Sequence, residues 1–379
     1  MKPIQLACIV GARPNFMKMA PLLRALDAET LAGKVVATLI HTGQHYDKNL
    51  SEVFFEELGM RRPDLSLEVG SGSHAVQTAR VLERIEEVLG KGPAGGGRFD
   101  RLVVVGDVNS TMAASLAAVK MGISVAHVEA GLRSFDRTMP EEINRIVTDS
   151  ISDMLLVSDP AGIENLAREG HPAEQVHLVG NVMIDTLMRM LPRARELDGP
   201  GRLGLQAGHY GVVTLHRPAN VDDPDVLAGL VDVLVDISAD IPLVFPVHPR
   251  TTERLTRAGL LGRFEQAPGI HLLSPLGYLD FLSLTSQARV IVTDSGGLQE
   301  ESTVLGIPCL TMRPNTERPV TVEEGTSTLI GSDPDKLRRH LVEVLEGRYR
   351  QGRCPDLWDG QAAGRIAALL VADIKGDAA

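Results

Sequence analysis

Residues 127–145, HVEAGLRSFDRTMPEEINR, decide how the chain divides into strand, loop and helix. An apolar run at residues 123–126 comes just before them and predicts a strand. Polar residues begin where that strand should end, with Glu129 at its carboxyl end and Gly131 at a sharp turn. Because open parallel α/β sheets bind ligands outside the carboxyl ends of their strands, Glu129 is a candidate site residue.

The same stretch predicts a helix that begins at Pro140. Proline is common at the first helical position, where its missing N–H is not needed. Glu141 and Glu142 then fall in the first turn, where acidic side chains interact favourably with the helix dipole. Helix-start chemistry explains these two glutamates as well as catalysis does, so the local pattern leaves both interpretations open.

Composition indicates a two-domain α/β protein. The 379 residues exceed what one hydrophobic core usually supports, and 44% of them are apolar. A formal charge of −11 argues against general affinity for nucleic acid or an anionic membrane, although a local basic site can still bind phosphate. No apolar run approaches bilayer thickness, and the first residues predict a strand, not a signal peptide.

Cysteine and histidine spacing predicts neither disulfides nor a metal site. Cys8, Cys309 and Cys354 are odd in number and widely spaced, so we expect reduced thiols in the cytoplasm. His127 and Glu129 are two residues apart on a strand, and the chain has no HExxH or CxxC spacing. We therefore expect no metal.

Strand and helix patterns alternate along the whole chain, which favours parallel sheets with right-handed crossovers. We expect two Rossmann-type, doubly wound domains at residues 1–180 and 181–379, with a hinge near Gly180 and Asn181. A last helix at about residues 361–374 is a candidate to pack back on the first domain. Strands are predicted at residues 4–10, 35–40, 102–105, 123–126, 154–157, 176–179, 211–215, 243–247, 270–273, 290–293 and 309–312.

The segment VIVTDSGGLQEE carries the strongest phosphate-binding pattern. A buried strand is followed by Asp294, Ser295, Gly296 and Gly297 and then by a helix, which offers free backbone N–H groups at a helix start. An ordinary strand–helix turn uses glycine in the same way, so both interpretations stand. Glu301, farther along, is either a ligand of a ribose or an ordinary helix acid.

Cations and missing motifs narrow the chemistry. Arg13, His216, Arg217 and Arg318 follow predicted strands or lie in a proline-rich loop, where together they suit the neutralisation of a leaving group. The chain has no GxxxxGK[ST], which excludes a P-loop enzyme, and GARPN replaces the dinucleotide fingerprint GxGxxG after the first strand. Phosphate-binding loops and several carboxylates remain, without a redox cofactor.

Eight motifs follow one another between positions 11 and 319. They are GARPNFMKMAP, HTGQHYD, GDVNST, HVEAGLRSFDRTMPEEINR, TLHRPAN, PVHPR, TDSGGLQEE and NTERP. In this order they closely resemble the non-hydrolysing UDP-N-acetylglucosamine 2-epimerases. The resemblance implies a GT-B-like fold, a UDP-sugar in the cleft between two domains, no cofactor, and usually a homodimer. It also implies that the second domain binds UDP and that the first faces the sugar.

The resemblance also implies residue roles by motif position. The acid/base candidates around the sugar are Asp107, Glu129 and Glu141, and His216 is a catalytic candidate that faces the diphosphate. The implied substrate contacts are Arg13 and Lys18 near the phosphates and sugar, Ser295, Gly296, Gly297 and Arg318 at the diphosphate, Glu301 at the ribose and Phe281 near uracil.

The implied reaction is epimerisation at C2 of UDP-N-acetylglucosamine, by elimination of UDP to a 2-acetamidoglucal and re-addition. Which carboxylate acts on which face of C2 stays open. A GT-B glycosyltransferase, a 2-epimerase for a related UDP-acetamido sugar, a hydrolysing epimerase and a non-catalytic sensor are the alternatives. Transfer to an acceptor would identify the glycosyltransferase, and free sugar in the products would identify the hydrolysing epimerase. No turnover at all would identify the sensor.

Three departures from the family pattern are visible. Many relatives have HRREN where this chain has HRPAN, with Pro218 and Ala219. Many relatives have GTRPE where this chain has GARPN, so Ala12 and Asn15 replace a hydroxyl and a carboxylate. Some bacterial members are activated by their own substrate through a glutamine three positions after the one matching Gln44, and Asp47 stands there in this chain. We therefore expect weak or absent activation by substrate.

Overall fold

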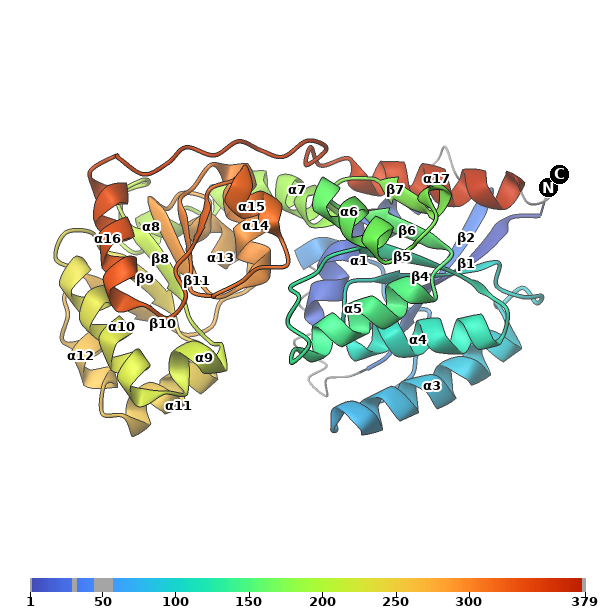
Figure 1. Ribbon diagram of the computed structural model, residues 1–379, viewed down its shortest axis with the longest axis horizontal. Coiled ribbons are helices and arrows are strands. Elements are labelled where there is room, and N and C mark those ends of the chain that lie inside the picture. Colours follow the sequence, from blue (N-terminus) through green and yellow to red (C-terminus); the bar gives the residue numbers. More distant parts are fainter. Residues whose placement is uncertain (1, 29–32, 44–56, 377–379) are drawn as a thin grey trace. The chain divides into compact units, whose positions relative to one another are not determined.

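The computed structural model describes residues 2–28, 33–43 and 57–376, and they form two compact units (Figure 1). The first unit comprises Met1–Thr186 and Asp356–Ala379, and the second comprises Leu187–Pro355. Gln44 and Asp47, on which the expectation about activation depends, lie outside the described residues, as does the side chain of Arg13. Within the described part, no helix is both long and apolar enough to cross a membrane.

The first unit is built on a seven-stranded parallel sheet in the order β3-β2-β1-β4-β5-β6-β7. All residues of β1 and β4 are buried, as expected for central strands covered on both faces. The chain order reverses between β1 and β4, so their carboxyl ends form a topological switch point. The strands are β1 (Ile4–Val10), β2 (Val35–His41), β3 (Leu65–Ser66), β4 (Arg101–Val105), β5 (Ser124–Ala130), β6 (Met154–Val157) and β7 (Val176–Leu178).

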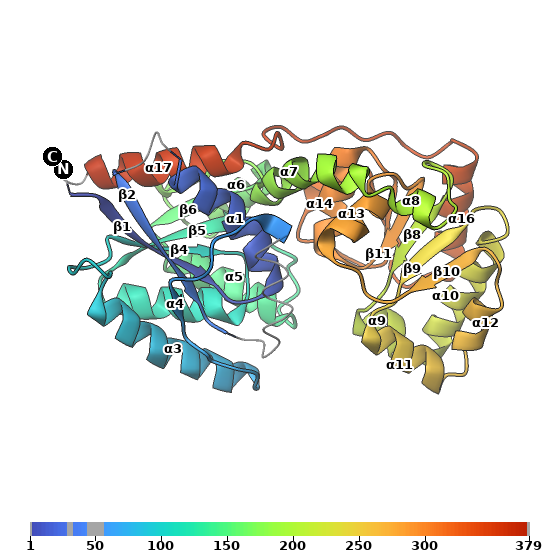
Figure 2. The ribbon, with the colours of Figure 1, turned by 180° about the vertical axis from the view of Figure 1, so that it is seen from behind.

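Helices cover both faces of this sheet. On one face α3 and α4 pack side by side, and on the other α1 packs against α17, the C-terminal helix (Figures 1 and 2). Ile85 of α3 and Ala114 of α4 share a core cluster with Ile9, Leu102 and Val104 of the sheet. The helices are α1 (Arg13–Leu26), α3 (His74–Lys91), α4 (Asn109–Lys120), α5 (Pro140–Ser150), α6 (Pro160–Arg168), the 3-10 helix η1 (Ala173–Gln175), α7 (Val182–Glu196) and α17 (Ala362–Gly376).

The second unit repeats this topology with six parallel strands in the order β10-β9-β8-β11-β12-β13, so its switch point lies between β8 and β11. The two doubly wound sheets confirm the predicted fold class. The strands are β8 (Gly211–Thr214), β9 (Leu243–Pro246), β10 (Ile270–Leu273), β11 (Val290–Thr293), β12 (Cys309–Thr311) and β13 (Ser327–Leu329). The helices are α8 (Gly199–Arg202), α9 (Pro218–Val221), α10 (Pro224–Ile237), α11 (Pro249–Arg257), α12 (Leu261–Glu265), α13 (Tyr278–Thr285), α14 (Gly296–Leu305), α15 (Pro319–Glu323) and α16 (Pro334–Leu345).

The structure differs from the sequence expectation at β5. The apolar run ends at Ala126, but the strand continues to Ala130 and carries His127 into the interior. His127 is fully buried because both ring nitrogens meet oxygen atoms there, one of Asp149 and one of Gly106. Strands β3 and β13 were not predicted, since they are only two and three residues long.

The C-terminal helix α17 is fixed to the first unit by polar contacts as well as apolar ones. Asp185 of α7 accepts hydrogen bonds from the backbone N–H groups of Ala362 (3.1 Å) and Ala363 (2.7 Å), in the first turn of α17. The indole N–H of Trp358 donates to the carbonyl oxygen of Ser158 (3.1 Å). Asp185 therefore caps the N-terminus of α17, although it lies in a distant part of the chain.

We expect Asp185→Ala to lower the free energy of unfolding by about 1 to 2 kcal/mol, because two buried N–H groups lose their acceptor. Urea unfolding followed by circular dichroism measures the change. The exposed Glu174 of η1 offers a control, and Glu174→Ala should cost less than about 0.5 kcal/mol. Equal losses in the two variants would contradict the capping role.

Candidate active site

A buried ion pair lies at the carboxyl end of the first unit's sheet. The ammonium of Lys18, on α1, contacts the carboxylate of Glu129, on β5, and both side chains are buried. Gly106 follows β4 and faces this pair with φ of 69°. A Cβ atom at Gly106 would lie 2.8 Å from the Lys18 ammonium nitrogen, so a larger residue would displace the ammonium as well as strain the backbone.

The backbone of Glu129 is strained. Its φ is 73°, in the left-handed region that residues other than glycine rarely adopt. The pairing of β5 with β6 shifts register between Val128 and Ala130, which is a β-bulge at Glu129. Bulges redirect a side chain, and strain of about 1 to 3 kcal/mol persists only where surrounding contacts hold it. The bulge sets the direction of the Glu129 carboxylate.

Asn15 ties the loop after β1 to the end of β4. Its side-chain oxygen accepts from the N–H of Ala12 (3.0 Å) and Gly11 (3.3 Å), and its amide donates to the carbonyl oxygen of Val105 (2.6 Å). The family difference at this position thus has a structural consequence, because the asparagine amide supplies a donor that a carboxylate lacks. It joins the two strand ends of the switch point.

Asp107 is held by a buried guanidinium. Arg145 of α5 pairs with the carboxylate of Asp107 and, at 2.7 Å, with that of Glu142. Glu142 also accepts from the backbone N–H of Ser134 and of Phe135, both at 2.9 Å. Burial alone would raise the pKa of Glu142, but the hydrogen bonds from Arg145 and Ser134 outweigh it and lower that pKa.

The two adjacent glutamates of α5 therefore differ. Glu142 is buried in the network that holds Asp107, whereas Glu141 is exposed in the first helical turn. The family resemblance singled out Glu141, and no role was predicted for Arg145, although the spacing of Glu142 and Arg145, three residues apart on a helix, is typical of an ion pair. Asp107 and Glu129 are on neighbouring strand ends, β4 and β5.

In the second unit, Asp294 joins the two loops of the switch point. Its buried carboxylate accepts from the N–H of His216 (2.9 Å) and Arg217 (2.8 Å) and from the amide of Asn220 (3.0 Å). The ring nitrogen Nδ1 of His216 lies 2.8 Å from the other carboxylate oxygen. Burial would raise the pKa of Asp294, but the contacts with His216 and Arg217 lower it. The His216 side chain stays 42% exposed.

The glycine-rich turn and Arg318 lie together in the same unit. Ser295 precedes α14, which begins at Gly296, and a Cβ atom on Gly296 would be 3.1 Å from a guanidinium nitrogen of Arg318. A Cβ atom on Gly297 would meet nothing within 4 Å, so open space adjoins this turn. Arg318 is fixed by the carboxylates of Glu300 (2.6 Å) and Glu317 (2.5 Å).

Glu301 is a buried carboxyl group on α14. Burial, reinforced by the charge of Glu300, raises its pKa from 4.5 to about 7, although a 2.9 Å hydrogen bond from the Tyr278 hydroxyl opposes the shift. Phe281 lies on the same helix as Tyr278, half-buried against an apolar cluster that includes Leu298. No local pattern pointed to Tyr278, whose partner is 23 residues away.

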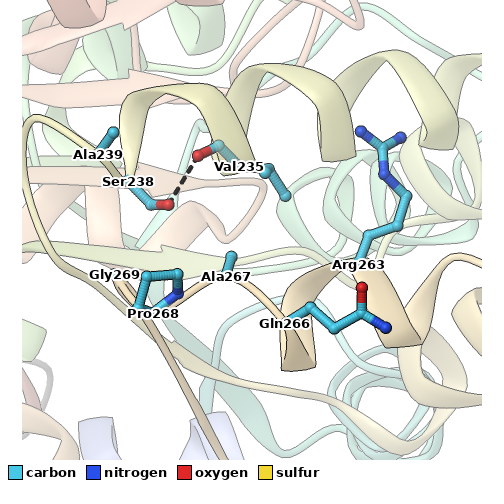
Figure 3. A pocket seen from close by; sticks show the side chains of 8 residues that line it. All are labelled: Val235, Ser238, Ala239, Arg263, Gln266, Ala267, Pro268 and Gly269. Carbon is cyan, nitrogen blue, oxygen red and sulfur yellow. Dashed lines mark hydrogen bonds between the residues drawn. The ribbon is translucent and has the colours of Figure 1, made fainter.

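A surface pocket of about 640 Å³ lies elsewhere in the second unit, between the end of α10 and the segment around α12 (Figure 3). None of the predicted site residues lines it. Its lining residues are Val235, Ser238, Ala239, Arg263, Gln266, Ala267, Pro268 and Gly269.

Two doubly wound parallel sheets, each with polar loops gathered at its switch point, define a GT-B-like protein of the kind that binds nucleotide sugars. The family model described as UDP-N-acetylglucosamine 2-epimerase matches residues 28–371, and the chain belongs to this family. The family resemblance predicted from the motifs is confirmed.

Individual relatives are similar over nearly their whole length. A UDP-N-acetylglucosamine 2-epimerase of Methanocaldococcus jannaschii is 40% identical over 372 residues, which cover 97% of this chain and 99% of that protein. A UDP-2,3-diacetamido-2,3-dideoxy-D-glucuronate 2-epimerase of Pseudomonas aeruginosa is 39% identical over 370 residues, with the same coverage. The crystal structure of the M. jannaschii enzyme in complex with UDP-GlcNAc and UDP superposes with a TM-score of 0.85 at 39% identity, covering 97% of this chain and 99% of that one.

The raised pKa of Glu301 predicts a pH-dependent stability. The folded protein holds this proton up to about pH 7 and the unfolded chain only to about 4.5, so stability is present at low pH and is lost as pH rises through 7. Between pH 5.5 and 8 the free energy of unfolding of the unmodified protein should fall by about 2 kcal/mol more than that of Glu301→Gln. Urea unfolding of both proteins at several pH values measures it.

The exposed Glu265 provides the matched control. Glu265→Gln should leave the pH dependence of unfolding as it is in the unmodified protein. Parallel stability curves for the unmodified protein and Glu301→Gln would show that Glu301 ionises at its ordinary pH.

Proposed function

We propose that the protein inverts C2 of UDP-N-acetylglucosamine to form UDP-N-acetylmannosamine, by eliminating and re-adding UDP. The observation that carries the proposal is the buried Lys18–Glu129 pair beside Asp107 at the first unit's switch point, in a chain that belongs to the 2-epimerase family. Glu129, Asp107 and the exposed Glu141 are the acid/base groups in this proposal.

The chemistry needs both proton transfer and anion stabilisation. The C2 proton is not acidic while C1 bears a phosphate ester, so its removal is coupled to departure of UDP. The C1–O bond breaks with its electrons on UDP, a carboxylate takes the C2 proton, and a C1–C2 double bond forms. A proton then arrives at the other face of C2 while a UDP oxygen adds to C1. Two faces require more than one acid/base group.

The second unit supplies the anion-stabilising groups in this proposal. His216 is half-exposed and backed by Asp294, and Arg318 is adjacent to the Ser295–Gly297 turn, where open space adjoins Gly297. Cations and helix-start N–H groups stabilise a departing diphosphate. We assign Glu301 to the ribose and Phe281 to the uracil side, and Arg13 and Lys18 to the phosphates and sugar.

A 2-epimerase acting on a related UDP-acetamido sugar is the second candidate. The observation that favours it is that the P. aeruginosa relative, named for a diacetamido uronic acid, is 39% identical, while the M. jannaschii one is 40% identical. Activity toward both UDP-sugars, measured side by side, decides between them. A glycosyltransferase is disfavoured by the family to which the chain belongs.

We also propose that the enzyme works in the cytoplasm as a homodimer. Two of its three free cysteines, Cys8 and Cys309, are buried and Cys354 is exposed, which suits a reducing compartment. The homodimer rests on the family resemblance alone. Light scattering of the purified protein tests it.

UDP-sugar turned over in D2O should yield product that carries deuterium at C2, because the incoming proton comes from a carboxyl group that exchanges with water. Proton NMR reads the C2 position directly. Glu129→Gln and Asp107→Asn should each lower the rate by at least about 10²-fold, the lower end of what one acid/base group contributes. Both variants should still bind UDP, since neither residue is assigned to the diphosphate.

Retention of protium at C2 in the epimer would rule out elimination and re-addition through an exchanging group. Formation of no epimer from either UDP-sugar would point instead to the transferase or the sensor. Arg257→Gln, which changes an exposed residue of α11, is the activity control and should turn over at the normal rate.

Turnover should be unaffected by EDTA, because the diphosphate charge is met by protein cations and backbone N–H groups in this proposal. The rate is measured after dialysis against chelator and again after magnesium is added. Loss of activity with EDTA and its return with magnesium would show that a metal neutralises the leaving group.

A further inference from the structure

We propose that the buried pair of His127 and Asp149 is a positioning device that holds the catalytic carboxylates Asp107 and Glu129 in register. This inference rests on the acid/base roles proposed above. Neither His127 nor Asp149 belongs to the predicted site, and both are fully buried. Their contacts reach the backbone beside each of the two carboxylates.

His127 holds the end of β4. Its Nε2 lies 2.8 Å from the carbonyl oxygen of Gly106, the residue just before Asp107. The same Gly106 donates its N–H to the carbonyl oxygen of Val128 (3.1 Å), the residue just before Glu129. Movement of the imidazole would therefore loosen the backbone at Gly106. Asp107 follows directly in the chain, and the Lys18–Glu129 pair lies against this glycine.

Asp149 holds the other side of the bulge. One carboxylate oxygen lies 2.6 Å from Nδ1 of His127, and the other accepts from the N–H of Gly131 (3.1 Å). Gly131 is two residues after Glu129, and the amide of Asn165 donates to its carbonyl oxygen (2.9 Å). The strained residue is thus tethered on both sides by the same pair of side chains.

The strained backbone of Glu129 needs contacts such as those of His127 and Asp149. A left-handed φ at a glutamate persists only when its surroundings prevent relaxation, and a misplacement of about 1 Å in a reacting group can cost about 10²-fold in rate. Val128 and Gly131, the backbone on either side of the bulge, are linked to His127 and Asp149 directly or through Gly106. Relaxation at Glu129 would turn its carboxylate away from Lys18.

The pair is also part of a longer chain of charged groups. The carbonyl oxygen of Gly106 can only accept, so Nε2–H of His127 donates to it, and Nδ1 faces the Asp149 carboxylate. Burial would raise the pKa of Asp149, but His127 and Arg133 lower it. Arg133 lies 2.7 Å from Asp149 and is in turn paired with Glu169, so charges alternate along the chain of contacts.

The test compares Asp149→Leu with Glu169→Gln. Leucine is close to aspartate in size but accepts from neither His127 nor Gly131, whereas the Glu169 change alters only the outer end of the chain. We expect kcat of the Asp149 variant to fall about tenfold to a hundredfold, with KM and the affinity for UDP changed less than about twofold. Glu169→Gln should keep kcat within about twofold.

A second measurement separates positioning from loss of folded protein. In D2O, deuterium at C2 of recovered substrate is compared with epimer formed. A smaller folded fraction lowers the rate of deuterium exchange into substrate and the rate of epimer formation equally, so their ratio is unchanged. Misaligned carboxylates on the two faces of C2 change this ratio. We expect a changed ratio for Asp149→Leu and an unchanged ratio for Glu169→Gln.

If Asp149→Leu does not fold, His127→Asn is the variant to measure. Its amide nitrogen stands near the former Nδ1 and keeps the bond to Asp149, while the bond to Gly106 is lost, so kcat should fall and the exchange ratio should change. An active unmodified enzyme whose variants keep normal kcat and exchange ratio would overturn the positioning role. An unmodified enzyme that forms no epimer would instead refute the function on which it rests.

Discussion

The ion pair between Lys18 and Glu129 is the interaction on which the first unit's site depends. Removing an ammonium and a carboxylate from water costs several kcal/mol per ion, so the pair persists only with close geometry and further polar support. Gly106 leaves room for it, the β-bulge directs Glu129 toward it, and the loop tied by Asn15 brings α1 to the strand ends. These features converge because the sheet order reverses between β1 and β4.

The second unit uses the same topology for different chemistry. At its switch point the buried carboxylate of Asp294 accepts from the loop after β8 and leaves His216 half-exposed beside it. Arg318 approaches the turn before α14, where a Cβ atom on Gly296 would come close to its guanidinium. One topology thus places a buried ion pair at the switch point of one unit, and a half-exposed histidine and a buried arginine beside a helix start at that of the other.

Several residues of the candidate site could not be assigned a role from local sequence patterns. Glu141 and Glu142 are equivalent as helix-start acids, and only the fold distinguishes them, because Arg145 and the backbone of Ser134 meet Glu142 alone. No role was predicted for His127, since a histidine on a strand gives no sign of its partner 22 residues later. Tyr278 was missed for the same reason.

By itself, the sequence determined the alternation of strand and helix, the class of fold, the family, and the loops that follow each strand. These follow from hydrophobic periodicity and turn residues, which act over a few positions, and from motifs in a fixed order. Tertiary structure alone decided that β5 runs to Ala130, that Glu129 is strained, and that Arg145 holds Asp107. Those outcomes depend on groups brought together from distant segments, 111 residues apart for Lys18 and Glu129, and no local pattern encodes such pairings.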